Sequence, residues 1–358
     1  MKDRLLELDA MRGIAALAVV LFHFTINKNG AELGWQFSYG VTGVDIFFMI
    51  SGFVIFLTIN HTDRWQGFVT SRFSRLYPTY WVCVLFTTAF VMIYEPDTLT
   101  IPKVLANLTM FPSYFGMEDL DGSYWTLLIE LWFYFWILMV YVSGKLKNII
   151  EIGFILLFSI IAFHFFGSYY PKLYLLALQK VHLINHFPLF LSGIIFYKIK
   201  YDKLKPQHIV ACAICILASI YLHDKGGRTM YILGIYEHSA LIIFYHIIFV
   251  LFVAGKLAFL NIKPLLFLGK ISYSLYLLHQ YIGLNLIESF RNLGLGIYPS
   301  LFICLAICIA LAWLVTTYIE IPAVRYIRKK TGRERTTAQS SSEKKPALHI
   351  SKTGYLFQ

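Results

Sequence analysis

Residues 8–24 have the sequence LDAMRGIAALAVVLFHF, and this stretch decides the fold. Apart from Arg12 and His23, the stretch from Met11 onward is apolar, and it belongs to a run over residues 9–27 that is long enough for a membrane-spanning helix. Ionisable side chains are costly inside a bilayer and usually serve a function there. The stretch therefore predicts a spanning helix that contains two functional residues.

Arg12 and His23 share one face of this helix. They are eleven residues apart, which at helical geometry separates them by only about 20° around the axis and by about 16 Å along it. Arg12 is expected near the cytoplasmic mouth, and His23 roughly two-thirds of the way across. The two side chains are too far apart to touch, but one long ligand could contact both.

Composition extends this interpretation to the whole chain. Of its 358 residues, 58% are hydrophobic and only 14% are charged, and the mean hydropathy is +0.64. A soluble protein has roughly a quarter charged residues, so lipid must surround most of this one. The net charge of +11 does not indicate nucleic-acid binding, because the basic residues lie in short gaps between apolar runs.

The apolar runs predict an all-α polytopic membrane protein with about ten transmembrane helices. A further apolar stretch, 101–116, contains Pro102 and Pro112 and is expected to be interfacial or re-entrant. The ten expected spans are 9–27, 39–59, 77–94, 123–142, 149–166, 184–197, 208–222, 230–254, 265–287 and 298–321.

The distribution of lysine and arginine predicts the orientation. Most of them lie in segments on the same side of the membrane as the N-terminus. Because segments rich in lysine and arginine face the cytoplasm, both termini are expected there. We expect a transmembrane domain over residues 1–330 and a disordered cytoplasmic tail over 331–358. No cleavable signal peptide is evident. The five cysteines all lie in apolar runs and are expected to be core residues, so no metal site is predicted.

Further ionisable residues lie within the expected spans. Counted from the ends of their helices, they all fall in the outer half of the bilayer, near the level of His23, which suggests a buried polar pocket. Structural roles remain open for several of them. Asp45 could form a salt bridge or helix cap, and His164 and His246 are favoured as packing residues. The five pocket candidates are Asp45, Glu130, Glu237, His238 and His279.

A pair of arginines forms a second candidate site. Arg72 and Arg75 are expected in an inner loop just before the third span, where a helical turn would point both the same way. Guanidinium groups suit phosphate oxygens, although anchoring at the inner membrane face would explain the pair equally well. Together with Arg12, they could hold the phosphates of a nucleotide-containing donor.

At these residues the chain resembles the membrane-bound acyltransferase-3 family over approximately residues 5–325. Arg12 and His23 match the Arg/Lys-x10-His pattern of that family, and Arg72 and Arg75 match its RxxR pair. Five segments agree beyond the N-terminal stretch: GVDIFFMISGF at 43–53, RFSRLYPTYW at 72–81, YWTLLIELWFY at 124–134, FLGKISYSLYLLH at 267–279 and YIEIP at 318–322.

The resemblance implies ten helices, an acyl-CoA donor that is usually acetyl-CoA, and transfer to a sugar hydroxyl. The acceptor would belong to a surface polysaccharide, a lipid-linked glycan or a related molecule. His23 would be the essential histidine of the family. The protein is then expected in the bacterial cytoplasmic membrane. Some members carry an esterase-like domain after the membrane part; from the short polar tail we expect the stand-alone form without it.

O-acyl transfer needs a base for the acceptor hydroxyl, and histidine is the usual one. The hypothesis is that His23 is this base or a transient acyl carrier, with Glu130 or Asp45 orienting its ring. Glu237, His238, His279 and Trp125 would contact the acceptor. Trp125 could equally belong to the aromatic belt at the outer surface. The alternatives are a proton-coupled transporter and a non-catalytic accessory protein of polysaccharide synthesis.

Overall fold

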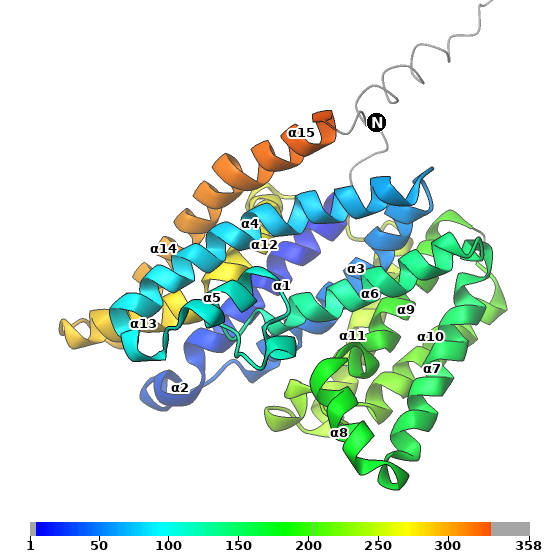
Figure 1. Ribbon diagram of the computed structural model, residues 1–358, viewed down its shortest axis with the longest axis horizontal. Helices are drawn as coiled ribbons and strands as arrows, with labels where there is room; N and C mark the ends of the chain where they lie inside the picture. The colour runs from blue at the N-terminus through cyan, green and yellow to red at the C-terminus, as the bar shows by residue number, and fades with distance from the viewer. Residues whose placement is uncertain (1–4, 203, 331–358) are drawn as a thin grey trace, which may run out of the picture.

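The computed structural model describes residues 5–202 and 204–330, and within these ranges the chain is helical, without strands (Figure 1). The predicted disordered tail at 331–358 lies outside the described residues. The helices are α1 Leu6–Thr25, α2 Asn27–Leu33, α3 Gly43–Ile59, α4 Trp65–Tyr94, α5 Ile101–Leu108, α6 Trp125–Val142, α7 Ile149–Phe165, α8 Pro171–Lys180, α9 Leu183–Tyr201, α10 Pro206–Tyr221, α11 Ile235–Val253, α12 Lys263–Leu278, α13 Tyr281–Asn292, α14 Ile297–Val315 and α15 Ile321–Lys330, with a π-helix, η8, at Thr316–Glu320.

Seven helical segments of the described chain are long and apolar enough to cross a membrane. They are Leu6–Thr25, Ser38–Ile59, Trp65–Tyr94, Trp125–Val142, Leu146–Phe165, Ile235–Val253 and Ile297–Lys330. Each of the ten predicted spans overlaps at least one helix, but α9, α10 and α12 fall outside this set of seven. The class is confirmed: the chain is an all-α polytopic membrane protein.

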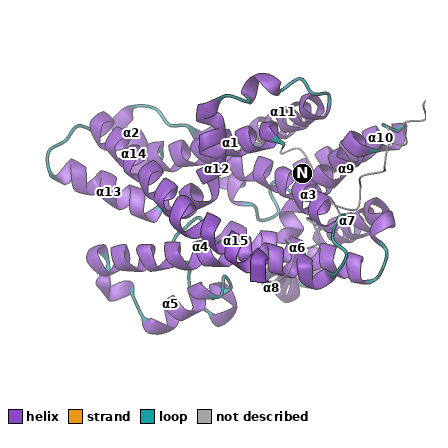
Figure 2. Ribbon diagram, turned by 90° about the horizontal axis from the view of Figure 1, so that it is seen from above, coloured by secondary structure: helices purple, strands orange, loops and turns teal. Residues whose placement is uncertain are grey.

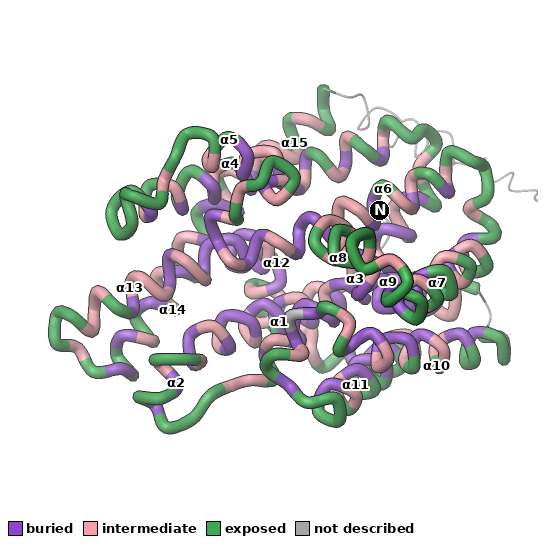
Figure 3. Tube along the Cα trace, turned by 60° about the horizontal axis from the view of Figure 1, so that its bottom comes forward, coloured by how far each residue is buried: buried purple, intermediate pink, exposed green. Residues whose placement is uncertain are grey.

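Helices α1, α3 and α12 form the centre of the molecule (Figures 1 and 2). Helices α7, α9, α10 and α11 gather at one end, and α2, α13 and α14 at the other. Buried residues concentrate in α1, α3, α9 and α12, whereas α8 has none (Figure 3). The central helices are therefore protected on most sides, and polar groups on them can be kept away from lipid.

Glycines let the central helices approach closely. A Cβ atom at Gly269 of α12 would lie 2.0 Å from the Asp9 carbonyl oxygen of α1, and one at Gly13 would lie 2.6 Å from the Gly269 nitrogen. Helices α3 and α9 cross in the same way at Gly52 and Gly193. Small residues at such crossings bring backbones into van der Waals contact in membranes. The α1–α12 crossing also fixes how the outer ends of these two helices meet.

Three features of the helices differ from the prediction. Helix α4 begins at Trp65, so Arg72 and Arg75 lie within a helix and not in a loop. The span predicted over 265–287 is broken, because α12 ends at Leu278 and α13 begins at Tyr281. The short helices α2 and α8 were not predicted. Hydropathy alone misses such boundaries, because both sides of the α12–α13 break are apolar.

The stretch predicted to be interfacial or re-entrant forms helix α5 followed by a 3-10 turn, Pro112–Phe115. The chain then continues through a buried loop before α6 begins at Trp125. Leu120, Asp121 and Ser123 of this loop are all at most 4% exposed. The loop therefore enters the interior of the bundle and brings its backbone to the centre of the molecule.

Candidate active site

Two histidines from different central helices meet inside the bundle. His279 Nε2 lies 3.0 Å from His23 Nδ1, and the two rings are arranged edge to face with centroids 4.9 Å apart. His279 is fully buried, and His23 is partly buried. His23 comes from the last turn of α1, and His279 follows the last residue of α12.

The hydrogen bonds of the pair fix its tautomers. His279 Nδ1 lies 2.8 Å from the Tyr276 carbonyl oxygen, and His23 Nδ1 lies 3.0 Å from the Val19 carbonyl oxygen. A carbonyl only accepts, so both Nδ1 atoms carry hydrogen when the rings are neutral. His279 Nε2 is then an acceptor for the His23 Nδ1 hydrogen. The remaining lone pair of His23 is therefore on Nε2, as a general base requires.

His23 lines a cavity of about 370 Å³. This volume lies in the range of small-molecule binding sites in proteins. Other residues that line it include Ser123, Trp125, His186, Tyr231 and Gln280. The cavity thus combines aromatic rings with hydrogen-bonding groups, a composition that suits a polar ligand with apolar faces.

Asp121 holds the buried loop against the α12–α13 break. Its carboxylate accepts hydrogen bonds from the Ser123 backbone nitrogen at 2.7 Å, the Ser123 hydroxyl at 2.6 Å and the Tyr281 backbone nitrogen at 2.8 Å. Burial raises the pKa of Asp121, and these three hydrogen bonds oppose the rise. The sequence analysis missed this residue, since it lies outside the predicted spans, although an aspartate beside an apolar run is a visible signal.

A smaller cavity of about 70 Å³ adjoins the first, because Val44 and Tyr276 line both. Arg12, Ser51 and Glu130 are among its other lining residues. The two cavities together follow the face of α1 from Arg12 toward His23. This agrees with the predicted shared face of the two residues.

Glu130 lines the smaller cavity together with Arg12, whereas His23 lines the larger one. Its carboxylate accepts hydrogen bonds from the Ser51 hydroxyl at 3.0 Å and the Tyr134 hydroxyl at 2.5 Å. It also interacts electrostatically with Arg12 and Arg72. Helix α6 starts from the buried loop, so its first turns lie inside the bundle and bring Glu130 to the arginines.

The arginines predicted to bind phosphate do come together. Arg12 interacts electrostatically with Arg75, and Arg75 with Arg72, so helices α1 and α4 bring three guanidinium groups into one region. The Arg72 side chain donates to the Ser71 hydroxyl at 3.3 Å, while its buried Nε has no hydrogen-bond partner in the described part of the chain. A buried donor without a hydrogen bond is unfavourable, so this position favours a ligand that is rich in hydrogen-bond acceptors.

Glu320 also lies in the region of the three arginines. Like Asp121, it was not selected by the sequence analysis. It is 8% exposed, lies at the end of the π-helix Thr316–Glu320, and interacts electrostatically with Arg75 and Arg12. Short π-helical turns often mark functional positions. Glu320 belongs to the YIEIP segment, which was noted only as part of the family resemblance. The π-helical turn in this segment is the feature that places Glu320 near the arginines.

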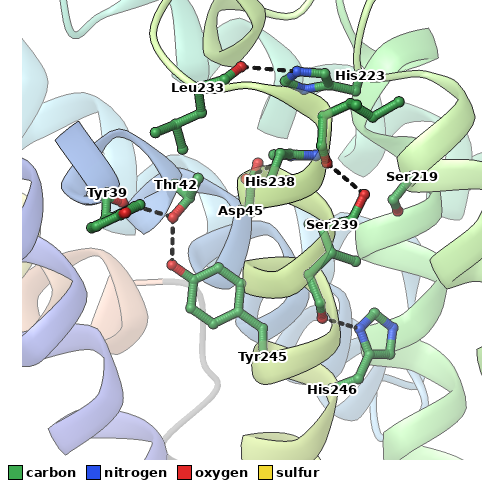
Figure 4. A network of polar contacts seen from close by, with 12 residues as sticks. Tyr39, Thr42, Asp45, Ser219, His223, Leu233, His238, Ser239, Tyr245 and His246 are labelled. Atoms are coloured by element: carbon green, nitrogen blue, oxygen red, sulfur yellow. Dashed lines mark hydrogen bonds and ion pairs between the residues drawn. The ribbon is translucent and has the colours of Figure 1, made fainter.

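Asp45 belongs to a different cluster (Figure 4). Its carboxylate lies 3.5 Å from His238 Nε2, and the His238 ring stacks on His223 at 4.4 Å. His223 Nε2 in turn donates to the Leu233 carbonyl at 3.1 Å. The cluster surrounds a cavity of about 20 Å³ that shares His186 and Thr229 with the His23 cavity. His23 Nδ1 thus contacts His279 and the Val19 carbonyl, whereas Asp45, proposed from sequence to orient the ring, contacts His238.

The remaining candidates separate into pocket and structural positions. Trp125 lines the His23 cavity, whereas Glu237 is exposed and accepts from the Gly234 nitrogen at 3.0 Å as part of a helix cap. His246 bonds Ser192 at 2.9 Å, and His164 bonds Tyr174 at 2.9 Å, in agreement with packing roles. No group of three potential metal ligands occurs among the described residues.

Fold and site together define a polytopic membrane protein with two adjoining cavities, one lined by His23 and the other by Arg12, and with Arg72 and Arg75 in the region of Arg12. Comparison with known sequences then identifies its family: the profile described as acyltransferase domain matches residues 5–319. The chain belongs to this acyltransferase family.

Two of three similar proteins are named as acetyltransferases. A putative acetyltransferase, ORF330, of Acidianus two-tailed virus is 26% identical over 287 residues, which cover 75% of this chain and 80% of that protein. The O-acetyltransferase OatA of Staphylococcus aureus is 27% identical over 319 residues, 76% of this chain and 49% of OatA. The exopolysaccharide production protein ExoZ of Rhizobium meliloti is 30% identical over 104 residues, 28% of this chain and 32% of ExoZ. This chain thus matches about half the length of OatA. No solved structure matches the chain.

Proposed function

We propose that this protein is an integral membrane O-acyltransferase that moves an acyl group from acyl-CoA to a hydroxyl of a carbohydrate. Acetyl-CoA is the favoured donor, and a surface polysaccharide or lipid-linked glycan the favoured acceptor. The setting is the bacterial cytoplasmic membrane. The observation that supports this proposal best is the adjoining pair of cavities, one lined by His23 and the other by Arg12.

The donor occupies the arginine side in this proposal. Arg72 and Arg75, with Arg12, bind phosphate groups of CoA near the cytoplasmic face. Guanidinium forks suit phosphate oxygens, and Glu130 and Glu320 offset part of the positive charge when no donor is bound. The pantetheine arm follows the face of α1, passes Val44 and Tyr276, and presents the thioester near His23.

The acceptor occupies the larger cavity. His23 Nε2 takes the proton of the acceptor hydroxyl while the hydroxyl oxygen bonds to the acyl carbon. The carbon–sulfur bond then breaks, and the proton on Nε2 passes to the departing thiolate, which leaves as CoA thiol. The products are an acyl ester and CoA, and His23 returns to its starting state.

Aromatic side chains support a carbohydrate acceptor. Trp125 and Tyr231 both line the His23 cavity, and their rings can stack on sugar faces while Ser123 and Gln280 bind hydroxyl groups. The names of ExoZ and OatA associate these relatives with exopolysaccharide production and with O-acetylation. The name of ExoZ supports a carbohydrate acceptor for this chain, and the name of OatA supports transfer to a hydroxyl oxygen.

The proposed roles can be separated with purified protein in lipid nanodiscs. His23→Ala should abolish transfer from acetyl-CoA, by a factor on the order of 10²–10⁴, while CoA binding stays near that of the wild type. Arg72→Ala combined with Arg75→Ala should instead weaken CoA binding at least about tenfold, which corresponds to the loss of about 1.4 kcal/mol. Wild-type transfer by His23→Ala would contradict the proposal.

A further inference from the structure

We propose that His279 is a positioning residue for His23: it holds the His23 ring in the tautomer that leaves Nε2 basic, and it stabilises the imidazolium that forms during transfer. This inference rests on the proposed function and adds a partner for its base. The sequence placed His279 at the acceptor, whereas the structure places it against the opposite nitrogen of the His23 ring.

The direction of each hydrogen bond supports this role. The Tyr276 carbonyl binds the His279 Nδ1 hydrogen, so a neutral His279 can only accept at Nε2. The His23 Nδ1 hydrogen lies between this nitrogen and the Val19 carbonyl, both at 3.0 Å. When His23 takes the proton of the acceptor, the positive charge on Nδ1–H faces two acceptors. A hydrogen bond to a charged donor is worth about 1.5–3 kcal/mol, more than one between neutral groups.

A neutral partner suits this position. His279 is 0% exposed, and an isolated carboxylate there would carry a large desolvation cost. The imidazole supplies an acceptor without placing a charge in the resting site. The arrangement resembles a catalytic triad in geometry, with histidine in the place of the usual acidic residue.

The surrounding elements keep His279 in place. It lies where α12 ends, and Asp121 accepts from the Tyr281 nitrogen at the start of α13, which holds the break closed. The other titratable groups around the pair are His186, Tyr231 and Tyr276, which line the same cavity, and Asp121 itself. All four remain unchanged in the variants used to test the role of His279.

The test compares His279→Leu, which removes the acceptor, with His279→Gln, whose side-chain oxygen can replace it. His246→Leu serves as the control. His246 is 4% exposed and forms a hydrogen bond of 2.9 Å with Ser192, and neither residue lines the His23 cavity. Initial rates of CoA thiol release from acetyl-CoA are measured against pH in nanodiscs, with purified glycan or water as acceptor. Thermal unfolding of each variant is measured in parallel.

We expect His279→Leu to lower kcat by a factor on the order of 10²–10⁴ with little change in the KM for acetyl-CoA. The acid limb of its pH profile should move to lower pH, because the imidazolium of His23 has lost a partner. His279→Gln should recover at least about tenfold of the lost rate. His246→Leu should lower thermal stability but keep the wild-type pH profile. A wild-type rate and profile for His279→Leu would overturn the proposal.

A second measurement does not depend on activity. Nitrogen NMR of ¹⁵N-histidine-labelled protein, with the His23 signal identified by its loss in His23→Ala, reports the tautomer directly. The Nδ1–H form is expected for His23 in the wild type and in His279→Gln. In His279→Leu the Val19 carbonyl alone accepts the Nδ1 hydrogen, so a larger share of the Nε2–H form is expected there. An Nε2–H tautomer in the wild type would refute the positioning role even if transfer is confirmed. Absence of transfer with the expected tautomer would refute the proposed function alone.

Discussion

The close crossing of α1 and α12 gives a prediction whose size follows from the structure. In Gly269→Ala, the new Cβ would lie 2.0 Å from the Asp9 carbonyl oxygen, which is backbone and cannot rotate away. Ordinary contact begins at 3.4 Å, so the two helices must separate by about 1.4 Å at this point. Overpacking of this kind costs about 1–3 kcal/mol in stability.

The displacement also reaches the two histidines. If about half of it is transmitted along α12, the His23–His279 separation grows from 3.0 Å to about 3.7 Å, beyond hydrogen-bonding distance. Misplacement of a catalytic group by about 1 Å can cost about 10²-fold in rate. We therefore expect Gly269→Ala to fold with reduced stability and to lose about 10- to 100-fold in transfer rate.

The assay measures thiol release from acetyl-CoA by protein that elutes as a folded species in size-exclusion chromatography. Gly153→Ala is the matched control, since the atoms nearest to its Cβ, from 2.5 Å, belong to the flexible Leu191 side chain on the α7–α9 interface. The control should keep its rate. A fully active Gly269→Ala protein would show that the crossing of α1 and α12 does not set the geometry of the histidine pair.

Three further predictions test other parts of the site. Burial raises the pKa of Asp121 above 3.8, so its stabilising contribution is complete below pH 3.8 and declines as the pH rises through the raised pKa. The thermal midpoint of the wild type relative to Asp121→Asn should fall over this range, and a pH-independent difference would contradict the assignment. Tyr134→Phe removes the 2.5 Å hydrogen bond to Glu130 and should lower the free energy of unfolding by about 1–3 kcal/mol. Denaturation curves that coincide with those of the wild type would contradict this prediction. Trp125→Ala should raise the acceptor KM while acetyl-CoA hydrolysis by water persists, with Trp125→Phe intermediate; equal acceptor KM values would remove Trp125 from the acceptor site.

Local sequence patterns predicted much of the helical framework. The apolar runs located a helix at each expected span, because a segment that crosses lipid must satisfy its backbone hydrogen bonds internally. The boundaries were less predictable. Arg72 and Arg75 lie on an extended α4 because the polar turns that precede the apolar run continue the same helix.

The depth of polar residues was the least predictable property. Counting residues from a surface assumes that each helix starts there, and the buried loop before α6 breaks this assumption for Glu130. Asp45 pairs with His238 across α3 and α11, a contact that depends on the rotation of both helices about their axes. Neither depth nor rotation follows from the hydropathy of one segment.

The sequence by itself determined that the chain is a helical membrane protein and that Arg12 and His23 lie on one face of its first long helix. Both conclusions depend on helical periodicity and on the cost of polar groups in lipid, which are local properties. Only the tertiary structure decided that His279 is the partner of His23 and that Glu130 joins the arginines. These contacts join residues far apart in the chain, and close helix crossings and a buried loop, not local pattern, bring them together.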